Sequence, residues 1–255
     1  MFRNVTPIFK RKYVLKKEML ENLRDYPRTL FHIQYQEYSD GILYGCRLEA
    51  ADTKLTVLPG IILFQGLPYY MEEPFELTCE AQGELTYLKV CFTDTEETTE
   101  HEEYRGQIYL DRQAPDNKRE LEIGRFKLQE GARLRTEYVD FKDYITEFDT
   151  VNRIYVPYAA PRHPVIWQQI LKCFAKEMIR HGIQEAWDCV FCMNCMQLRE
   201  AMPYETIQTY LNIKLGKEKE YTNEQIYNAL GRILQETGGN GRKKTGKQDN
   251  KLLMI

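Results

Sequence analysis

The β character of this chain is confined to one part of it, and that division constrains the fold more than any other feature. Between Asp40 and Val156, short apolar runs end at glycines or other turn residues, whereas the sequence from Pro164 onward has helical periodicity. A chain of 255 residues can bury a core in one large or two small domains. We therefore expect an α+β protein with a β-rich domain before a helical one.

Residues 39–70 have the strongest β pattern in the chain. Their apolar runs end at turn residues such as Gly45, Gly60 and Gly66, which is typical of a small antiparallel sandwich or barrel. Before them we expect a short helix that ends at Pro27, because proline disfavours a helical residue in front of it. Further strands are expected over residues 75–79, 85–92, 107–110 and 121–127.

The helical part predicts four amphipathic helices with short connections, which form a bundle or a pair of helical hairpins. Thr222 and Gln225 have capping-box spacing at the start of the last helix, and Gly238 and Gly239 are expected to end it. The apolar stripes exceed what one small bundle needs to cover, so we predict that copies of the chain associate through the helical half. The predicted interface consists of Trp167, Ile170, Leu171, Phe174, Met178, Trp187, Phe191 and Leu198.

The end of the chain reads as a separate tail, so the expected domains are residues 1–160, 161–237 and 238–255. A glycine-rich break and a basic spacer precede an apolar terminus in this tail. The favoured interpretation is an untethered terminus without a role, and the alternative is that Leu252, Leu253 and Ile255 dock into a groove on a neighbouring subunit.

Composition excludes several classes of partner. The 35 basic and 38 acidic residues give a net charge of −3, which offers no field to attract nucleic acid or anionic lipid. No apolar run approaches the roughly 20 residues that cross a bilayer, so we expect no direct membrane insertion. Seven cysteines without a disulfide pattern favour a reducing, cytoplasmic setting. The expected partners are proteins.

Two clusters could hold a metal, but we expect neither to do so. Cys189, Cys192 and Cys195 recur at three-residue steps on a predicted helix, where the thiols fan apart, and Arg199 stands where an iron-sulfur run needs a fourth cysteine. Helix packing is the favoured interpretation, and zinc or iron the alternative. The six carboxylates and one histidine of residues 94–103 predict a solvated hairpin loop, with a cation site as the alternative.

No catalytic motif is present in the sequence. Residues 239–245 resemble a phosphate-binding loop only superficially, because the Gly-Lys-Ser/Thr ending is missing. The four histidines are isolated from one another and from any nucleophile motif. We therefore expect no catalytic residues, no cofactor and no enzymatic activity.

Several short motifs resemble the type VI secretion baseplate subunit that links the baseplate to the membrane complex. They are Ile8-Phe9-Lys10 before a short helix, residues 123–127 (IGRFK), residues 131–134 (GARL) and Tyr155-Val156-Pro157 before a helix. The runs at residues 40–45 and 58–61 are also similar to the turn-rich strands of phage tail and baseplate fibre-anchoring domains.

The resemblance implies a β-rich shoulder domain that docks on the baseplate and a helical neck that trimerises, over residues 1–236. The family has a further head domain that binds the membrane complex, and no such domain follows Gly238 in this sequence. The expected role is therefore a structural baseplate or fibre-anchoring component of a contractile phage tail-like or type VI-like injection particle. The alternative is a ligand- or carbohydrate-binding β domain with a helical accessory, which would be monomeric and have an apolar cleft lined with exposed aromatic residues.

Overall fold

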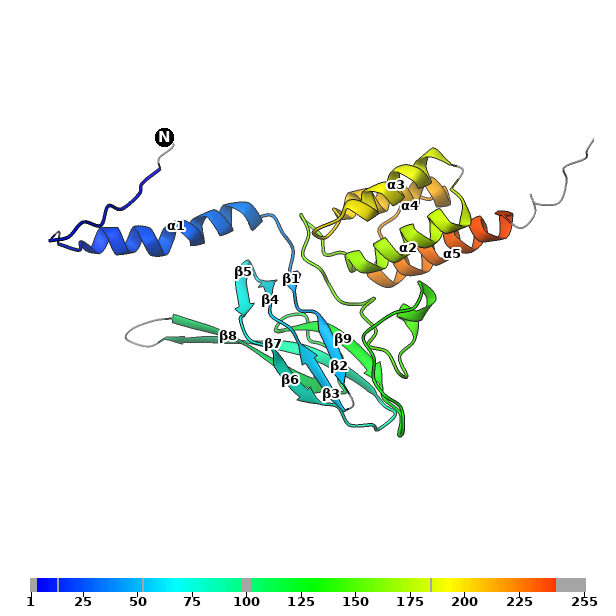
Figure 1. Ribbon diagram of the computed structural model, residues 1–255, viewed down its shortest axis with the longest axis horizontal. Helices are drawn as coiled ribbons and strands as arrows, with labels where there is room; N and C mark the ends of the chain where they lie inside the picture. The colour runs from blue at the N-terminus through cyan, green and yellow to red at the C-terminus, as the bar shows by residue number, and fades with distance from the viewer. Residues whose placement is uncertain (1–3, 13, 52, 98–101, 184, 242–255) are drawn as a thin grey trace, which may run out of the picture.

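The computed structural model describes residues 4–12, 14–51, 53–97, 102–183 and 185–241. Figure 1 shows an N-terminal helix, a central region of antiparallel strands and a C-terminal group of helices. The expected α+β class, with strands before helices, is confirmed, and the strands of the described residues form open sheets and no closed barrel.

The first helix, α1, spans Lys17–Tyr35 and runs outward from the start of β1 (Figure 1). The expected end at Pro27 is wrong, because Pro27 lies inside the helix. A proline removes one backbone hydrogen bond, but the turns after it are supported by the Phe31–Tyr35 ring contact and by the Tyr35–Tyr38 contact. The helix therefore continues to the edge of the β region.

In the described part of the chain, nine strands form three antiparallel sheets of three strands each, in the orders β1-β4-β5, β2-β3-β6 and β8-β7-β9. Strand β5 lies almost entirely within residues 39–70, where the β pattern is strongest, although Pro68 interrupts it. The strands are β1 Gly41–Gly45, β2 Leu48–Ala51, β3 Lys54–Val57, β4 Gly60–Phe64, β5 Leu67–Met71, β6 Phe75–Thr78, β7 Leu85–Glu97, β8 Glu102–Asp111 and β9 Glu120–Lys127.

Glycine is required where β1 meets β4. Gly45 has a φ of +69°, and it pairs with Gly60 in the register of the two strands. A Cβ atom at Gly45 would lie 2.7 Å from the Cα of Gly60, so a side chain would force the strands apart. This close approach keeps β1 and β4 together above the apolar interior.

After β9, a connecting segment with the short 3-10 helix η1 leads to four helices (Figure 1). Helix α2 packs against α3 and α5, and α4 packs against α5. The predicted capping box is confirmed, since the Gln225 N–H donates to Thr222 Oγ1 and the Thr222 N–H donates to Gln225 Oε1. The elements are η1 Lys142–Ile145, α2 Gln168–His181, α3 Ala186–Gln197, α4 Tyr204–Leu215 and α5 Asn223–Gly241.

Helix α5 does not end at Gly238 and Gly239 as expected, because it extends to Gly241. A helical glycine costs only about 1 kcal/mol relative to alanine, so it does not force a stop. Gly238 also lies against the imidazole of His181 at the end of α2, where a Cβ atom would be 3.0 Å from the ring. The small residue therefore allows the two helices to approach closely.

The β region and the helices share one contiguous apolar core. Its fully buried members include Ile42 and Leu88 from the sheets and Phe174 and Leu230 from the helices. The two halves of the chain are therefore joined by packing as well as by the connecting segment.

Candidate functional site

The described residues contain no group of three or more His, Cys, Asp or Glu side chains placed to hold a metal ion. Of the isolated histidines, His163 stacks on Tyr204 and His181 lies against Gly238. Within the same residues, no helix has both the length and the apolar character needed to span a membrane. The features that stand out are instead surfaces that other molecules could cover.

Helix α3 is apolar on two opposite sides, which is unusual for a helix at the edge of a bundle. Its inner side is buried and includes Phe191, Cys192 and Cys195. On its outer side Trp187, Val190 and Met193 are 56%, 55% and 52% exposed. We call these three residues the α3 outer face. Such a face is typical of a protein-protein contact, because monomeric proteins rarely expose grouped large apolar side chains.

The inner side of α3 is fixed to α4 by stacking and by hydrogen bonds. The rings of Phe191 and Tyr210 stack with centroids 3.8 Å apart. The Tyr210 hydroxyl donates to Asp188 at 2.8 Å, and Lys214 Nζ lies 3.1 Å from the other oxygen of that carboxylate. Burial, together with the hydrogen bond to Asp188, raises the pKa of Tyr210. These contacts hold the α3 outer face in one orientation.

Most residues of the predicted interface lie inside the chain's own core. Four of them, on α2, are completely buried there: Ile170, Leu171, Phe174 and Met178. Phe191 of α3 is 3% exposed. Trp167 and Leu198 are partly buried against that core. In the predicted set, Trp187 alone is largely exposed. The oligomer interface remains a prediction, and in the described helical half the most exposed large apolar side chains are those of the α3 outer face.

The interface predicted from the sequence includes Trp187, Phe191 and Leu198 in this region. It omits Val190 and Met193, whose side chains are exposed. The signal that could have found them is the near absence of a polar side on residues 186–197.

The cysteines of α3 differ in their surroundings. Cys189 is exposed, whereas Cys192 and Cys195 are buried. Burial raises the pKa of Cys192 to about 12, and it also raises the pKa of Cys195. Cys192 and Cys195 lie among the apolar residues of the core, and their packing role stays a prediction.

Two other expectations fall partly or wholly outside the described residues. Strands β7 and β8 pair as an antiparallel hairpin and extend into the acidic run, so the expected loop is shorter than residues 94–103. Residues 98–101 at its centre lie outside the described part of the chain. The same is true of the docking residues Leu252, Leu253 and Ile255.

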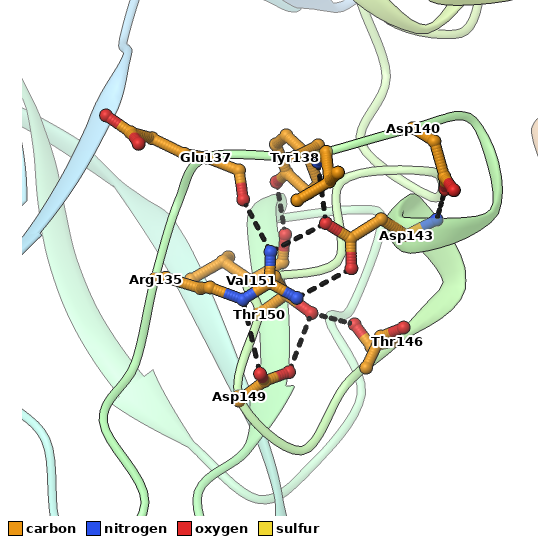
Figure 2. A network of polar contacts seen from close by, with 10 residues as sticks. Arg135, Glu137, Tyr138, Asp140, Asp143, Thr146, Asp149, Thr150 and Val151 are labelled. Carbon is orange, nitrogen blue, oxygen red and sulfur yellow. Dashed lines mark hydrogen bonds and ion pairs between the residues drawn. The ribbon is translucent and has the colours of Figure 1, made fainter.

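A polar network around Arg135 holds the connecting segment in place (Figure 2). Both Nη atoms of Arg135 donate to the carboxylate of Asp143 at 2.6 Å, and its Nε donates to Asp149 at 3.2 Å. Asp143 also accepts a hydrogen bond from the Val139 N–H. The Arg135 hydrogen bonds hold the pKa of Asp143 below its ordinary value. The segment between β9 and α2 is therefore tightly folded.

This segment carries an aromatic contact into the helical half. The ring of Phe141 stacks on Tyr227 of α5 and meets Phe174 of α2 edge to face. The Phe141 N–H donates to Glu177 of α2 at 2.6 Å, and the Tyr227 hydroxyl donates to the Phe141 carbonyl at 2.6 Å. These contacts fix the helices relative to the connecting segment.

A second connection runs through a buried arginine. The guanidinium of Arg153 lies 4.5 Å from the ring centre of Trp167, just before α2, and its Nη2 donates to the carbonyl of Cys46 at 3.1 Å. Arginine combines a planar cation with directional donors, so one side chain can join the end of β1 to the start of the helices. The helical half is therefore held to the β region through Arg153 as well as through the connecting segment.

A groove of about 1070 Å³ lies between α1 and the β region. Its walls are mostly apolar or aromatic, and Tyr70 at its edge is largely exposed. The groove has the character that the alternative hypothesis of a ligand-binding β domain requires. Among the lining residues are Phe31, Tyr35, Ile61, Tyr69, Tyr70 and Phe92.

No family model and no curated protein matches this chain. Two solved structures are similar to it in fold. A crystal structure of TssK is 10% identical over 93% of this chain and 69% of its own, with a TM-score of 0.38. The type VI secretion TssK-TssF-TssG baseplate subcomplex, solved by cryo-electron microscopy, contains a chain that is 9% identical. That match covers 92% of this chain and 100% of the other, with a TM-score of 0.44. The likeness is distant and concerns the fold alone.

Proposed function

We propose that this protein is a structural component of a contractile injection particle, type VI-like or phage tail-like, and that it acts through protein contacts and not through catalysis. The observation that carries the proposal is the α3 outer face, with Trp187, Val190 and Met193 exposed on a helix whose other side is packed. Covering such a face removes apolar surface from water and gains about 25 cal/mol per Å². A partner that covers it therefore stabilises the assembly.

The partner we propose for this face is the same face of other copies, in a homotrimer. Closed symmetric assemblies bury one patch repeatedly around an axis, and a face made of a single rigid helix suits such an axis. The α3 outer face has no charged residue among its three members, so copies would meet without an unpaired buried charge.

The kind of particle is proposed from the motifs at residues 8–10, 123–127 and 155–157, which resemble the type VI baseplate subunit. In this proposal, the β region docks on other baseplate or tail subunits. The two rigid connections through Phe141 and Arg153 would transmit load between that docking region and the helical half.

Light scattering of the intact chain tests the self-association. The double variant Val190→Glu/Met193→Glu should be monomeric, because two carboxylates would be buried at the contact. The control Gln169→Glu/Gln235→Glu adds the same charge at exposed positions on α2 and α5 and should remain trimeric. A wild-type chain that is monomeric at high concentration would contradict the proposal.

The groove favours one alternative function, namely binding of a carbohydrate or another ligand by the β region. Exposed aromatic rings such as Tyr70 stack well on sugar faces and on apolar ligands. A glycan array probed with the full chain and with Tyr70→Ala would support this alternative if the wild type binds and the variant does not. The absence of binding would leave assembly as the sole function supported.

A further inference from the structure

Helix α1 carries very little that would keep it folded in a single chain. None of its residues is buried, the Lys16 N-cap makes no side-chain cap hydrogen bond, and Pro27 interrupts its backbone ladder. Helices of this length are marginal in water without tertiary packing, and an internal proline weakens them further. The helix therefore needs a partner surface to be stable.

The exposed apolar residues of α1 have coiled-coil spacing. Met19, Leu23, Tyr26, Leu30 and Ile33 follow one another at steps of four, three, four and three residues, which places Leu23 and Leu30 at a positions and the others at d positions. The last four of these residues are about half exposed or more. We call these five residues the α1 seam.

The seam faces away from the body of its own chain. The opposite side of α1 contributes Arg28, Phe31, His32 and Tyr35 to the groove above the β region. Phe31 and Tyr35 are correspondingly half-buried, whereas the members of the seam from Leu23 onward remain exposed. One side of the helix thus faces its own β region across the groove, and the seam is open to another molecule.

We infer that the occupant of the α1 seam is α1 of other copies of this chain, in a parallel three-stranded coiled coil. In the last heptad, Leu30 at a and Ile33 at d are the combination that favours three or four strands over two, while Met19 and Tyr26 hold the other d positions. The flanking e and g positions, Leu20, Asn22, Pro27 and Thr29 among them, carry no charge that would repel an identical helix. The helix as a whole is balanced, with three acidic and three basic residues. A three-stranded coiled coil also agrees with the proposed trimer. The inference rests on that proposed function only for the number of chains.

Chemical cross-linking of the full chain tests the geometry. In a Cys189→Ser background, which removes an exposed thiol, Ile33→Cys places a thiol on the seam and Arg24→Cys places one off it. A parallel coiled coil brings residue 33 of one chain beside residue 33 of the next, so a short bis-maleimide should link Ile33→Cys chains and leave Arg24→Cys chains unlinked. An antiparallel pair would set residue 33 opposite residue 19, and the absence of 33-to-33 links would overturn the inference.

Hydrogen exchange of residues 17–35 provides the second measurement. Their amide protection should rise with protein concentration in the wild type and be lost in Leu23→Glu/Leu30→Glu. The control Lys17→Gln/Arg24→Gln changes the net charge by the same amount off the seam and should keep the protection. Because α1 has no buried residue, neither variant should unfold the body of the protein.

The outcomes separate this inference from the proposed function. A chain that forms trimers through α3 without cross-linking at residue 33 overturns the inference and leaves the proposed function standing. Cross-linking at residue 33 that survives Val190→Glu/Met193→Glu supports the inference and contradicts the role of the α3 outer face. Protection of α1 that appears only after a different protein is added overturns self-pairing, because the seam would then belong to that protein.

Discussion

Helices α1 and α2 have the same kind of sequence pattern but opposite surroundings. The apolar stripe of α2, from Ile170 to Met178, is completely buried by α3, α5 and the connecting segment. The stripe of α1, from Leu23 to Ile33, is exposed. Periodicity therefore shows that a helix has an apolar side, and the packing of the rest of the chain determines whether that side is buried within the same chain. Equivalent truncations in the two helices should have very different effects.

The largest effect is expected from Phe174→Ala in α2. Phe174 is fully buried and meets the rings of Phe141, Phe191 and Tyr210, so its removal leaves a cavity at the centre of the helical half. We expect a loss of about 3–5 kcal/mol in the free energy of unfolding, measured by urea denaturation. A loss below about 1 kcal/mol would mean that the site collapses around the smaller residue and is not tightly packed.

A smaller, pH-dependent effect is expected at the Arg135 network. Asp143→Asn removes the charged acceptor of two hydrogen bonds and should cost about 1–3 kcal/mol near neutral pH. Because the folded pKa of Asp143 is lowered, its contribution is fully present above the unfolded pKa of about 3.9 and is lost as pH falls through the lower folded value. Unfolding curves of the wild type and the variant should therefore converge in acid. A difference that is constant with pH would contradict the role of the ion pair.

The sequence was most informative where local chemistry decides the structure. The helices α2 to α5, most strands and the Thr222–Gln225 cap follow from patterns within a few residues. The extent of α1 beyond Pro27 was mispredicted, because aromatic contacts after the proline support the helix. The end of α5 beyond Gly238 was also mispredicted, because this glycine serves the close approach to His181 and does not end the helix. Val190 and Met193 of the α3 outer face were missed for a related reason. A stripe pattern identifies apolar residues but does not show which of two sides the other helices will cover.

The next effect concerns the inner side of α3. Cys192→Ala should cost about 1 kcal/mol, because a buried thiol is replaced by a slightly smaller apolar group. Assembly measured by light scattering should not change, since Cys192 faces the core and not the outer face. Stoichiometric zinc or iron in anaerobically purified wild type, absent from the variant, would show instead that the cysteines bind metal.

The smallest effect on the isolated chain is expected from Leu30→Ala in α1, the counterpart of Phe174→Ala. Leu30 is exposed, so at protein concentrations too low for self-association the free energy of unfolding should change by less than about 0.5 kcal/mol. At high concentration the variant should lose helical signal in circular dichroism relative to the wild type, because the wild-type helices can then cover one another. Exposed Arg24→Ala serves as the control, with no expected dependence on concentration. If Leu30→Ala destabilises the dilute chain as strongly as a core truncation, the α1 stripe packs against its own chain, and the contrast between the two helices disappears.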